Sequence, residues 1–265
     1  TGIPDPDLND PEVSTSIWQE VVNIADRHND PGKFTTFSGF EYTSAPDKRN
    51  LHRVVIFKDS DVMPDLPFST FDSDRPEDLW AWMDQQRANG SELLAITHNG
   101  NASNGLMFPE TTSYGGSALN KEYAETRMRN EPVYEVSQVK GTSETHPNLS
   151  PNDEFAGFEI WDYTLSAHGE SVTQWVGCYA RDALKRGLLL DTEGNGNPYK
   201  FGFIGDSDSH NAAASIEEDN HTGKFGIENN PSNRLNGPPG GPELNQKQIR
   251  EFSSGGVAGI WAEAN

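Results

Sequence analysis

The stretch ELLAITHNGNASNGLMF (92–108) decides the fold, because an apolar strand pattern and a polar loop meet in it at His98. The run 92–98 is apolar and of strand length, which predicts a buried β-strand. A lone histidine there is more often structural, but its place at a strand end favours a role as a ligand. The amides of Asn99 and Asn101 in the following loop either orient a bound oxyanion or turn the chain.

Outward from this strand, helical and strand patterns alternate along the chain. The segment 76–90 predicts a helix, with Pro76 in its first turn and Gly90 at its end. The other predicted helices are 14–30, 120–130 and 171–187, and the other predicted strands are 34–43, 52–59, 133–139 and 200–208. Segment 157–165 fits either type. The alternation is typical of an α/β fold with largely parallel strands.

The composition excludes several classes of protein. No run approaches the roughly 20 apolar residues that a membrane span needs. The 265 residues carry a net charge of −21, which disfavours nucleic-acid binding through a basic face. This acidity reflects either a solvated surface or a basin that concentrates metal cations. Cys178 is the only cysteine, so an intrachain disulfide is excluded, and its amphipathic helical surroundings indicate a buried thiol.

The motif GFIGDSDSHNA (202–212) is the sharpest candidate for a metal site. An apolar strand leads to Asp208 and His210, two residues apart, so both side chains can reach one ion. A carboxylate with an imidazole suits Zn, Mn or Fe. The alternative is a turn stabilised by aspartates with a surface histidine. Asp206 is a second candidate carboxylate, more typical of a turn.

A carboxylate inside the aromatic strand SGFEYTS (38–44) is the next candidate. Burying Glu41 without a partner is costly, so it needs a metal ion or a cationic side chain. Arg53 on the neighbouring strand is the structural alternative as that partner, and it is also a candidate to hold substrate. His52 is a candidate ligand or substrate contact, ranked below His98.

The segment KGTSETHPNLSPNDEF (140–155) supplies two further candidates after a predicted strand. His146 precedes Pro147, which fixes the local backbone and can present the imidazole rigidly. Lys140 is placed to hold a non-reacting part of a substrate.

Several long motifs together resemble the DUF3604 family, a group of uncharacterised proteins. They are FTTFSGFEYTS, NLHRVVIFKD, PEDLWAWMD, ITHNGNASNGLMF, RNEPVYEVSQVKGTSETHPNLSPNDEFAGFE and GFIGDSDSHNA. The resemblance spans nearly the whole chain. The family is in turn similar to the PHP superfamily, whose members are distorted β/α barrels that bind up to three metal ions and hydrolyse phosphoesters.

The resemblance implies a ligand set and a fold for this chain. The later part of the PHP ligand order is a Glu at a strand end, two separate His and a final Asp-x-His. In this chain it is matched by Glu41, His98, His146, Asp208 and His210. No HxH pair and no early Asp-His motif occur in the sequence. We therefore expect a single PHP-like α/β domain over 1–265 that forms an incomplete barrel and has a long loop or insertion near 213–247. We also expect the chain to be the central part of a longer protein.

The expected function is metal-dependent hydrolysis. His98, Asp208 and His210 are the expected catalytic residues, and Arg53, Asn99, Asn101, Lys140 and His52 are the expected substrate contacts. The cofactor is a divalent transition metal (Zn, Mn or Fe), and the substrate is a small molecule of the phosphoester type. Another ester or amide hydrolase, or a binding module without catalysis, remains open. With few ligands, we expect at most one or two bound ions and weak hydrolysis. The oligomeric state stays open, and the expected location is extracytoplasmic or periplasmic.

Overall fold

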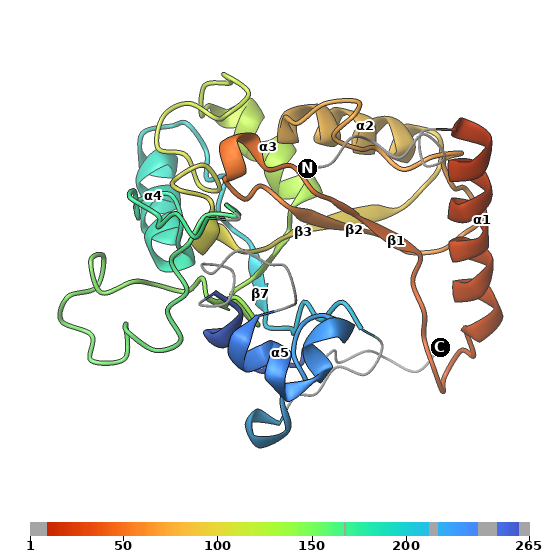
Figure 1. The fold of residues 1–265 in the computed structure, drawn as a ribbon. Helices are drawn as coiled ribbons and strands as arrows, with labels where there is room; N and C mark the ends of the chain where they lie inside the picture. The colour runs from red at the N-terminus through yellow and green to blue at the C-terminus, as the bar shows by residue number, and fades with distance from the viewer. Residues whose placement is uncertain (1–9, 167, 212–216, 238–247, 260–265) are drawn as a thin grey trace.

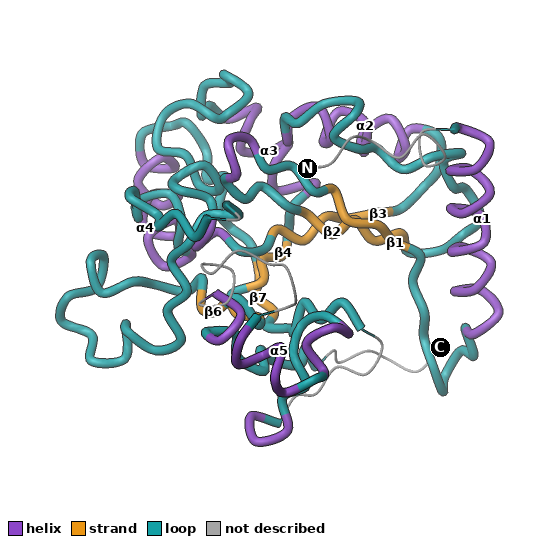
Figure 2. The backbone as a smooth tube through the Cα atoms, in the orientation of Figure 1, coloured by secondary structure: helices purple, strands orange, loops and turns teal. Residues whose placement is uncertain are grey.

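A five-stranded mixed sheet forms the centre of this computed structural model, with helices along one side of it and at its ends (Figure 1). The structure describes residues 10–166, 168–211, 217–237 and 248–259. The helices are α1 (Pro11–His28), α2 (Pro76–Ala88), α3 (Lys121–Asn130), α4 (Ala180–Thr192) and α5 (Pro231–Asn236). The strands are β1 (Gly39–Tyr42), β2 (Arg53–Phe57), β3 (Leu93–Thr97), β4 (Val133–Glu135), β5 (Ser137–Gln138), β6 (Gly141–Thr142) and β7 (Gly202–Ile204). Long loops make up much of the remaining chain (Figure 2).

Side-chain caps and prolines fix where the helices begin. The Asp10 side chain accepts a hydrogen bond from the backbone of Glu12 at 2.9 Å, ahead of Pro11 at the start of α1. The Asn120 side chain accepts one from the backbone of Tyr123 at 2.9 Å and caps α3. Such caps satisfy amide groups that have no partner inside the helix. The predicted helices 14–30, 76–90 and 120–130 are therefore present within a few residues of their expected ends.

The sheet is mixed, and the prediction of largely parallel strands was wrong. Its order is β1-β2-β3-β4-β7, in which β1 pairs with β2 and β2 with β3 antiparallel, while the β3–β4 and β4–β7 pairs are parallel. The β1–β2 link contains no α-helix, so it cannot make the crossover that parallel neighbours require. The predicted strand 133–139 is divided between β4 and the separate β5–β6 hairpin.

The α/β class is confirmed, but the strands do not close into a barrel. Within the described ranges, β1 and β7 are the two edges of an open sheet. The predicted loop or insertion near 213–247 is described only in part, because 213–216 and 238–247 lie outside the described residues.

The two faces of the sheet differ in what covers them. On one face, Val55 and Ala95 are fully buried and belong to a core cluster with Leu79, Trp80 and Met83 of α2. The opposite face borders a cavity of about 830 Å³. Aliphatic residues of the sheet line that cavity, among them Ile56, Leu94, Ile96, Val133 and Ile204.

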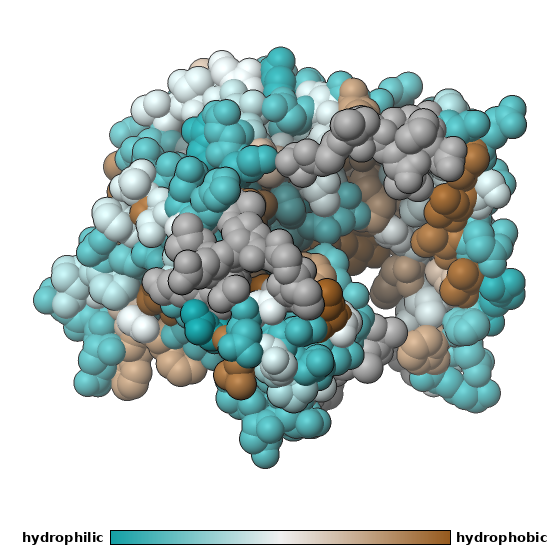
Figure 3. All heavy atoms as spheres, in the orientation of Figure 1, coloured by the Kyte–Doolittle hydropathy of each residue, from teal (hydrophilic) through white to brown (hydrophobic). Residues whose placement is uncertain are grey.

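An apolar strip also lies exposed along α1 at the edge of the molecule (Figure 3). The exposed apolar side chains of this helix are Val13, Ile17, Val21 and Ile24. On another side of α1, Trp18 and Val22 pack against the core, and the buried Trp18 lies edge-on to Phe40 with ring centroids 6.1 Å apart.

The predicted helix 171–187 was wrong in its first half. Helix α4 begins only at Ala180, and the preceding residues form a loop that includes Gly177 at φ +88°. A Cβ on Gly177 would lie 2.4 Å from the carbonyl oxygen of Gly105, so this loop position requires glycine. Cys178 in the same loop is fully buried, as expected, and its Sγ accepts a hydrogen bond from the Gly105 backbone at 3.0 Å.

Candidate metal and anion site

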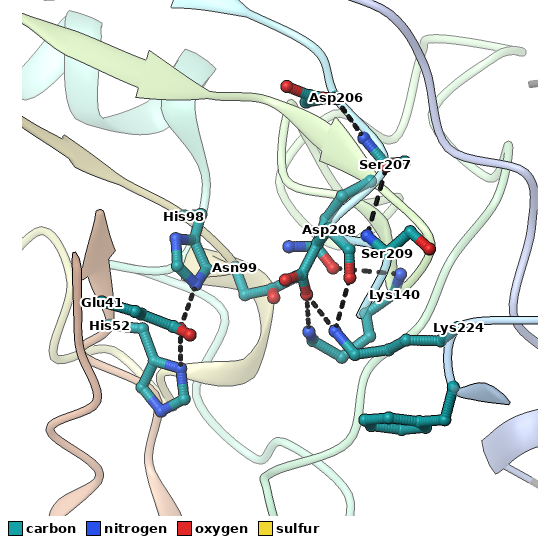
Figure 4. A network of polar contacts seen from close by, with 12 residues as sticks. Glu41, His52, His98, Asn99, Lys140, Asp206, Ser207, Asp208, Ser209 and Lys224 are labelled. Carbon is teal, nitrogen blue, oxygen red and sulfur yellow. Dashed lines mark hydrogen bonds and ion pairs between the residues drawn. The ribbon is translucent and has the colours of Figure 1, made fainter. Parts of the chain in front are cut away.

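A pocket of about 440 Å³ lies where the predicted site residues gather. Its polar lining combines acidic, imidazole and ammonium groups: Glu41, His52, Lys140, Asp208, His210 and Lys224. Aromatic and aliphatic side chains line another part: Trp161, Leu165, Phe225 and Phe252. Figure 4 shows Glu41, His52 and His98 facing the group formed by Asp208 and the two lysines.

The register of three strands brings Glu41, His52 and His98 together. Tyr42 of β1 and Thr97 of β3 both lie opposite Arg53 of β2. Glu41 is the neighbour of Tyr42, His52 precedes Arg53, and His98 follows Thr97, so all three emerge at one end of the sheet. The antiparallel pairing of β1, β2 and β3 therefore assembles this cluster.

Both imidazoles point to a single oxygen of Glu41. His52 Nδ1 lies 2.9 Å from Glu41 Oε1, and His98 Nε2 lies 3.1 Å from the same atom. Burial opposes ionisation of Glu41, but the contacts to the two histidines outweigh it and hold the pKa of this carboxyl well below its usual range. Burial lowers the pKa of His98, so that its imidazole favours the neutral form that binds metals.

This cluster fits a metal ion by its donor set and spacing. The ligand atoms of Glu41, His52 and His98 all lie within 4.8 Å of one another. Ligands about 2.0–2.1 Å from a tetrahedral ion are about 3.3 Å apart, close to the spacings found here. His98 Nε2 is buried, and its contact to Glu41 Oε1 at 3.1 Å is an ion-pair contact, with no hydrogen bond to that nitrogen among the described residues. A cation between these groups would satisfy that nitrogen.

Asp208 lies across the pocket between two ammonium groups. Lys140 Nζ and Lys224 Nζ both form ion pairs with its Oδ2 atom, and Lys224 Nζ also donates to the Asp208 carbonyl at 3.0 Å. Burial opposes its ionisation, but Lys140 and Lys224 outweigh burial and lower the pKa of Asp208. Its backbone is left-handed at φ +54°, a strained conformation that is enriched at functional sites.

Each lysine is held in place by its own segment. Lys140 lies in the turn between β5 and β6, where its carbonyl accepts a hydrogen bond from the Asn101 side chain at 2.9 Å. The next residue, Gly141, has φ +76°, and a Cβ there would lie 2.4 Å from the carbonyl oxygen of Glu159. Lys224 is anchored through its backbone amide, which donates to Glu228 Oε2 at 2.7 Å.

His210 closes one side of the pocket. Its ring stacks on Phe225 with centroids 5.0 Å apart and an interplanar angle of 25°. Burial, followed by the nearby Lys224 ammonium, lowers the pKa of His210. Burial and the adjacent Lys140 also lower the pKa of Lys224 to about 7. The ammonium groups of Lys140 and Lys224 thus share one carboxylate in a largely buried position.

Other predicted site residues lie elsewhere. Arg53 is 1% exposed and donates to Glu131 Oε1 at 2.8 Å, so its guanidinium serves a buried ion pair rather than Glu41 or this pocket. The ring of His146 stacks on Trp175 at 5.4 Å, and its Nδ1 accepts a hydrogen bond from the Asn148 backbone at 3.1 Å. His146 does not line the pocket that Glu41 and Asp208 share.

The two predicted asparagines have supporting positions. Asn101 is fully buried and also donates to the Trp161 carbonyl at 2.7 Å, so it ties the Lys140 turn to a pocket wall. Asn99 is buried with φ +49° and donates to Asn101 Oδ1 at 3.3 Å. Their amides turn and brace the chain, the second of the two roles considered from the sequence.

Sequence reasoning missed two ionisable residues near this site. Lys224 lies in a short polar segment, HTGKFG (221–226), with no strand pattern to mark it. Glu135 ends β4, and burial raises its pKa to about 8, with the charge of Asp208 adding to the effect. A carboxylate at the end of a strand that runs parallel to its neighbours was the available signal for Glu135.

The chain belongs to the DUF3604 family. The family model described as "Protein of unknown function (DUF3604)" matches residues 4–265, which confirms the family resemblance noted in the sequence. Comparison with curated proteins and comparison with solved structures gave no match. Among the described residues, no helix is long and apolar enough to cross a membrane.

Proposed function

We propose that this chain carries the metal centre of a hydrolase, in which Glu41, His52 and His98 hold one divalent transition metal ion. The observation that carries the proposal is the convergence of three metal-ligating side chains from three strand ends, with ligand atoms within 4.8 Å of one another. Three protein ligands leave an open position in a tetrahedral shell, the arrangement of catalytic rather than structural sites. Such an ion supplies Lewis acidity and lowers the pKa of coordinated water.

The rest of the pocket suits the cleavage of an ester. His210, with its lowered pKa, stays largely neutral near pH 7 and can accept a proton. Lys140 and Lys224 place positive charge opposite the three ligands. The similarity of the family to PHP phosphoesterases, although the open sheet does not form their barrel, favours a phosphoester as the first substrate class. Asp208, a predicted ligand, is held here by lysines and supports them.

Hydrolysis by the metal-loaded chain tests this proposal. Zn(II)- or Mn(II)-loaded protein is assayed against phosphate, sulfate and carboxyl esters, beside His98→Ala and the control His28→Ala, whose histidine is exposed on α1. We expect phosphoester cleavage that depends on added metal, is lost in His98→Ala and is kept in His28→Ala. Cleavage that persists in His98→Ala would refute the centre. Stoichiometric metal without cleavage of any ester would identify a binding module instead of an enzyme.

A further inference from the structure

The group formed by Lys140, Asp208 and Lys224 contains more positive than negative charge. Both ammonium groups contact the same carboxylate oxygen, so two positive charges are balanced there by one negative charge. The side chains of Lys140 and Lys224 are only 11% and 4% exposed, which limits the help that water can give. The repulsion between them, together with burial, is reflected in the lowered pKa of Lys224.

A ligand bound in the pocket can contact both of these positively charged groups. Lys140, Asp208 and Lys224 all line the cavity of about 440 Å³, so a bound group can reach both ammoniums from the open side. The two lysines come from segments 84 positions apart, yet each is separately fixed: Lys140 by the Asn101 contact to its backbone, and Lys224 by its amide bond to Glu228. Such a site is preorganised, which reduces the ordering cost of binding.

We infer that Lys140 and Lys224 form a binding site for a doubly charged oxyanion, such as a phosphate or sulfate group. A dianion adds the negative charge that the pair lacks and accepts hydrogen bonds from both ammonium groups. The ring and aliphatic walls of the pocket, including Trp161 and Leu165, take the organic part of the ligand. The site is positive within a chain of net charge −21, so the attraction is local.

Anion binding by the lysines is independent of the proposed function, whereas the orientation of the bound ligand toward a metal ion deepens it. If a metal ion is held by Glu41, His52 and His98, an anionic ester bound by the lysines has its reacting end directed across the pocket toward that ion (Figure 4). This placement rests on the proposed function. Anion binding by the lysines does not, because it requires no metal, and the two are measured separately.

Calorimetric titration of the metal-free protein with inorganic phosphate tests the site at about pH 7, where dianionic phosphate and the ammonium form of Lys224, whose pKa is lowered to about 7, are both present. The variants are Lys140→Met and Lys224→Met, with Lys224→Arg to keep the charge and Lys58→Met as the control. Lys58 forms an exposed ion pair with Glu92 at 2.9 Å, away from the pocket. We expect one phosphate per chain, with affinity about tenfold or more weaker in either pocket variant. Lys58→Met should match the wild type, and Lys224→Arg should retain binding.

The source of the oxyanion is resolved by competing anions. Sulfate that displaces phosphate supports a general dianion site, and phosphate that binds much more tightly than sulfate supports phosphoester ligands. Nitrate that binds as well as phosphate would overturn the inference, because a monoanion would then satisfy the pair. Absence of phosphate binding up to about 10 mM, or equal binding in Lys224→Met and the wild type with both folded by circular dichroism, would also overturn it. Zinc binding, measured on separately loaded portions of the same preparations, separates this result from a failure of the metal centre.

Discussion

Two carboxylates in this protein each lie between two cationic side chains, and their surroundings differ sharply. Glu131 is contacted by Arg53 at 2.8 Å and by Arg127 at 3.1 Å, and Trp80 also donates to it at 2.7 Å. All of these charged side chains are 2% exposed. Asp208 is contacted by two lysines through a single oxygen, and all three groups border a pocket.

The difference shows which of two similar charge clusters is structural. Arg53 and Trp80 donate to Glu131 Oε1, and Arg127 forms an ion pair with Oε2. The three charged side chains are 2% exposed, so the network has no open side from which a ligand could enter. At Asp208 both cations contact one carboxylate oxygen, and the backbone of the residue is left-handed. The side chain also borders the pocket. Burial, more than the count of charges, therefore separates a core ion pair from a binding site.

Glu131→Gln should produce the largest loss of stability. Removing this charge leaves Arg53 and Arg127 buried without a counter-ion, a change that costs about 3–5 kcal/mol. Urea unfolding of the variant and the wild type measures the difference, with Glu92→Gln as an exposed control. A loss below about 1 kcal/mol would mean that water reaches these arginines and that the contrast with Asp208 does not hold.

Glu135→Gln should raise stability by an amount that grows as the pH rises from about 4.5 to about 8. Glu135 Oε1 has no hydrogen-bond partner in the part of the chain that the structure describes, and burial raises the pKa of the carboxyl to about 8. Because the folded pKa is raised, the native state favours the protonated form. The wild type therefore loses stability as pH rises from the unfolded pKa through about 8.

Glutamine stays neutral, so the variant should gain about 2–4 kcal/mol over the wild type at about pH 9 and almost nothing at about pH 3.5, below the unfolded pKa. Thermal unfolding across this range measures the gain. A constant difference between the two proteins at all pH values would show that Glu135 does not titrate as described.

Asp208→Asn should cost less than the change at Glu131. Both lysines border the pocket and have flexible stems, so their ammonium groups can turn toward water when the carboxylate is lost. We expect a loss of about 1–2 kcal/mol in urea unfolding, between the values for buried and exposed pairs. A loss as large as that of Glu131→Gln would place Asp208 among the structural ion pairs and weaken the case for a binding site.

Arg181→Met should have the smallest effect on stability, because here one cation lies between two carboxylates and the cluster is exposed to solvent. Arg181 contacts two carboxylates, Glu144 and Asp153, and its side chain is 36% exposed. Solvent screening leaves such a pair with about 0–1 kcal/mol, which should shrink further in about 0.5 M salt. A salt-independent loss above about 2 kcal/mol would show that exposure does not rank these clusters.

The sequence predicted the elements better than their arrangement. Apolar runs located β2 and β3, helical periodicity located α1, and Pro76 with Gly90 located α2, because these signals are local. The direction of the β1–β2 and β2–β3 pairs depends on links and on packing that no local pattern records. The late start of α4 follows from the close approach of Gly177 to Gly105, a contact between distant residues.

The site was predicted in the same uneven way. Glu41 and His98 were identified because a polar side chain at the end of an apolar strand is visible in sequence. His52 was ranked below His98 from the sequence, and its closeness to Glu41 follows from the antiparallel register. Lys224 was missed because only the tertiary fold brings its loop to Asp208. Arg53 was paired with the wrong carboxylate, since Glu131 is distant in sequence.

Metal content of three proteins tests the central claim most directly. Wild type, His98→Ala and His28→Ala are loaded with Zn(II), dialysed against metal-free buffer and measured by elemental analysis. The account predicts about one tightly held ion per chain in the wild type and in His28→Ala, and almost none in His98→Ala, since two ligands hold zinc poorly. Equal zinc in His98→Ala and the wild type would contradict the metal centre at Glu41, His52 and His98.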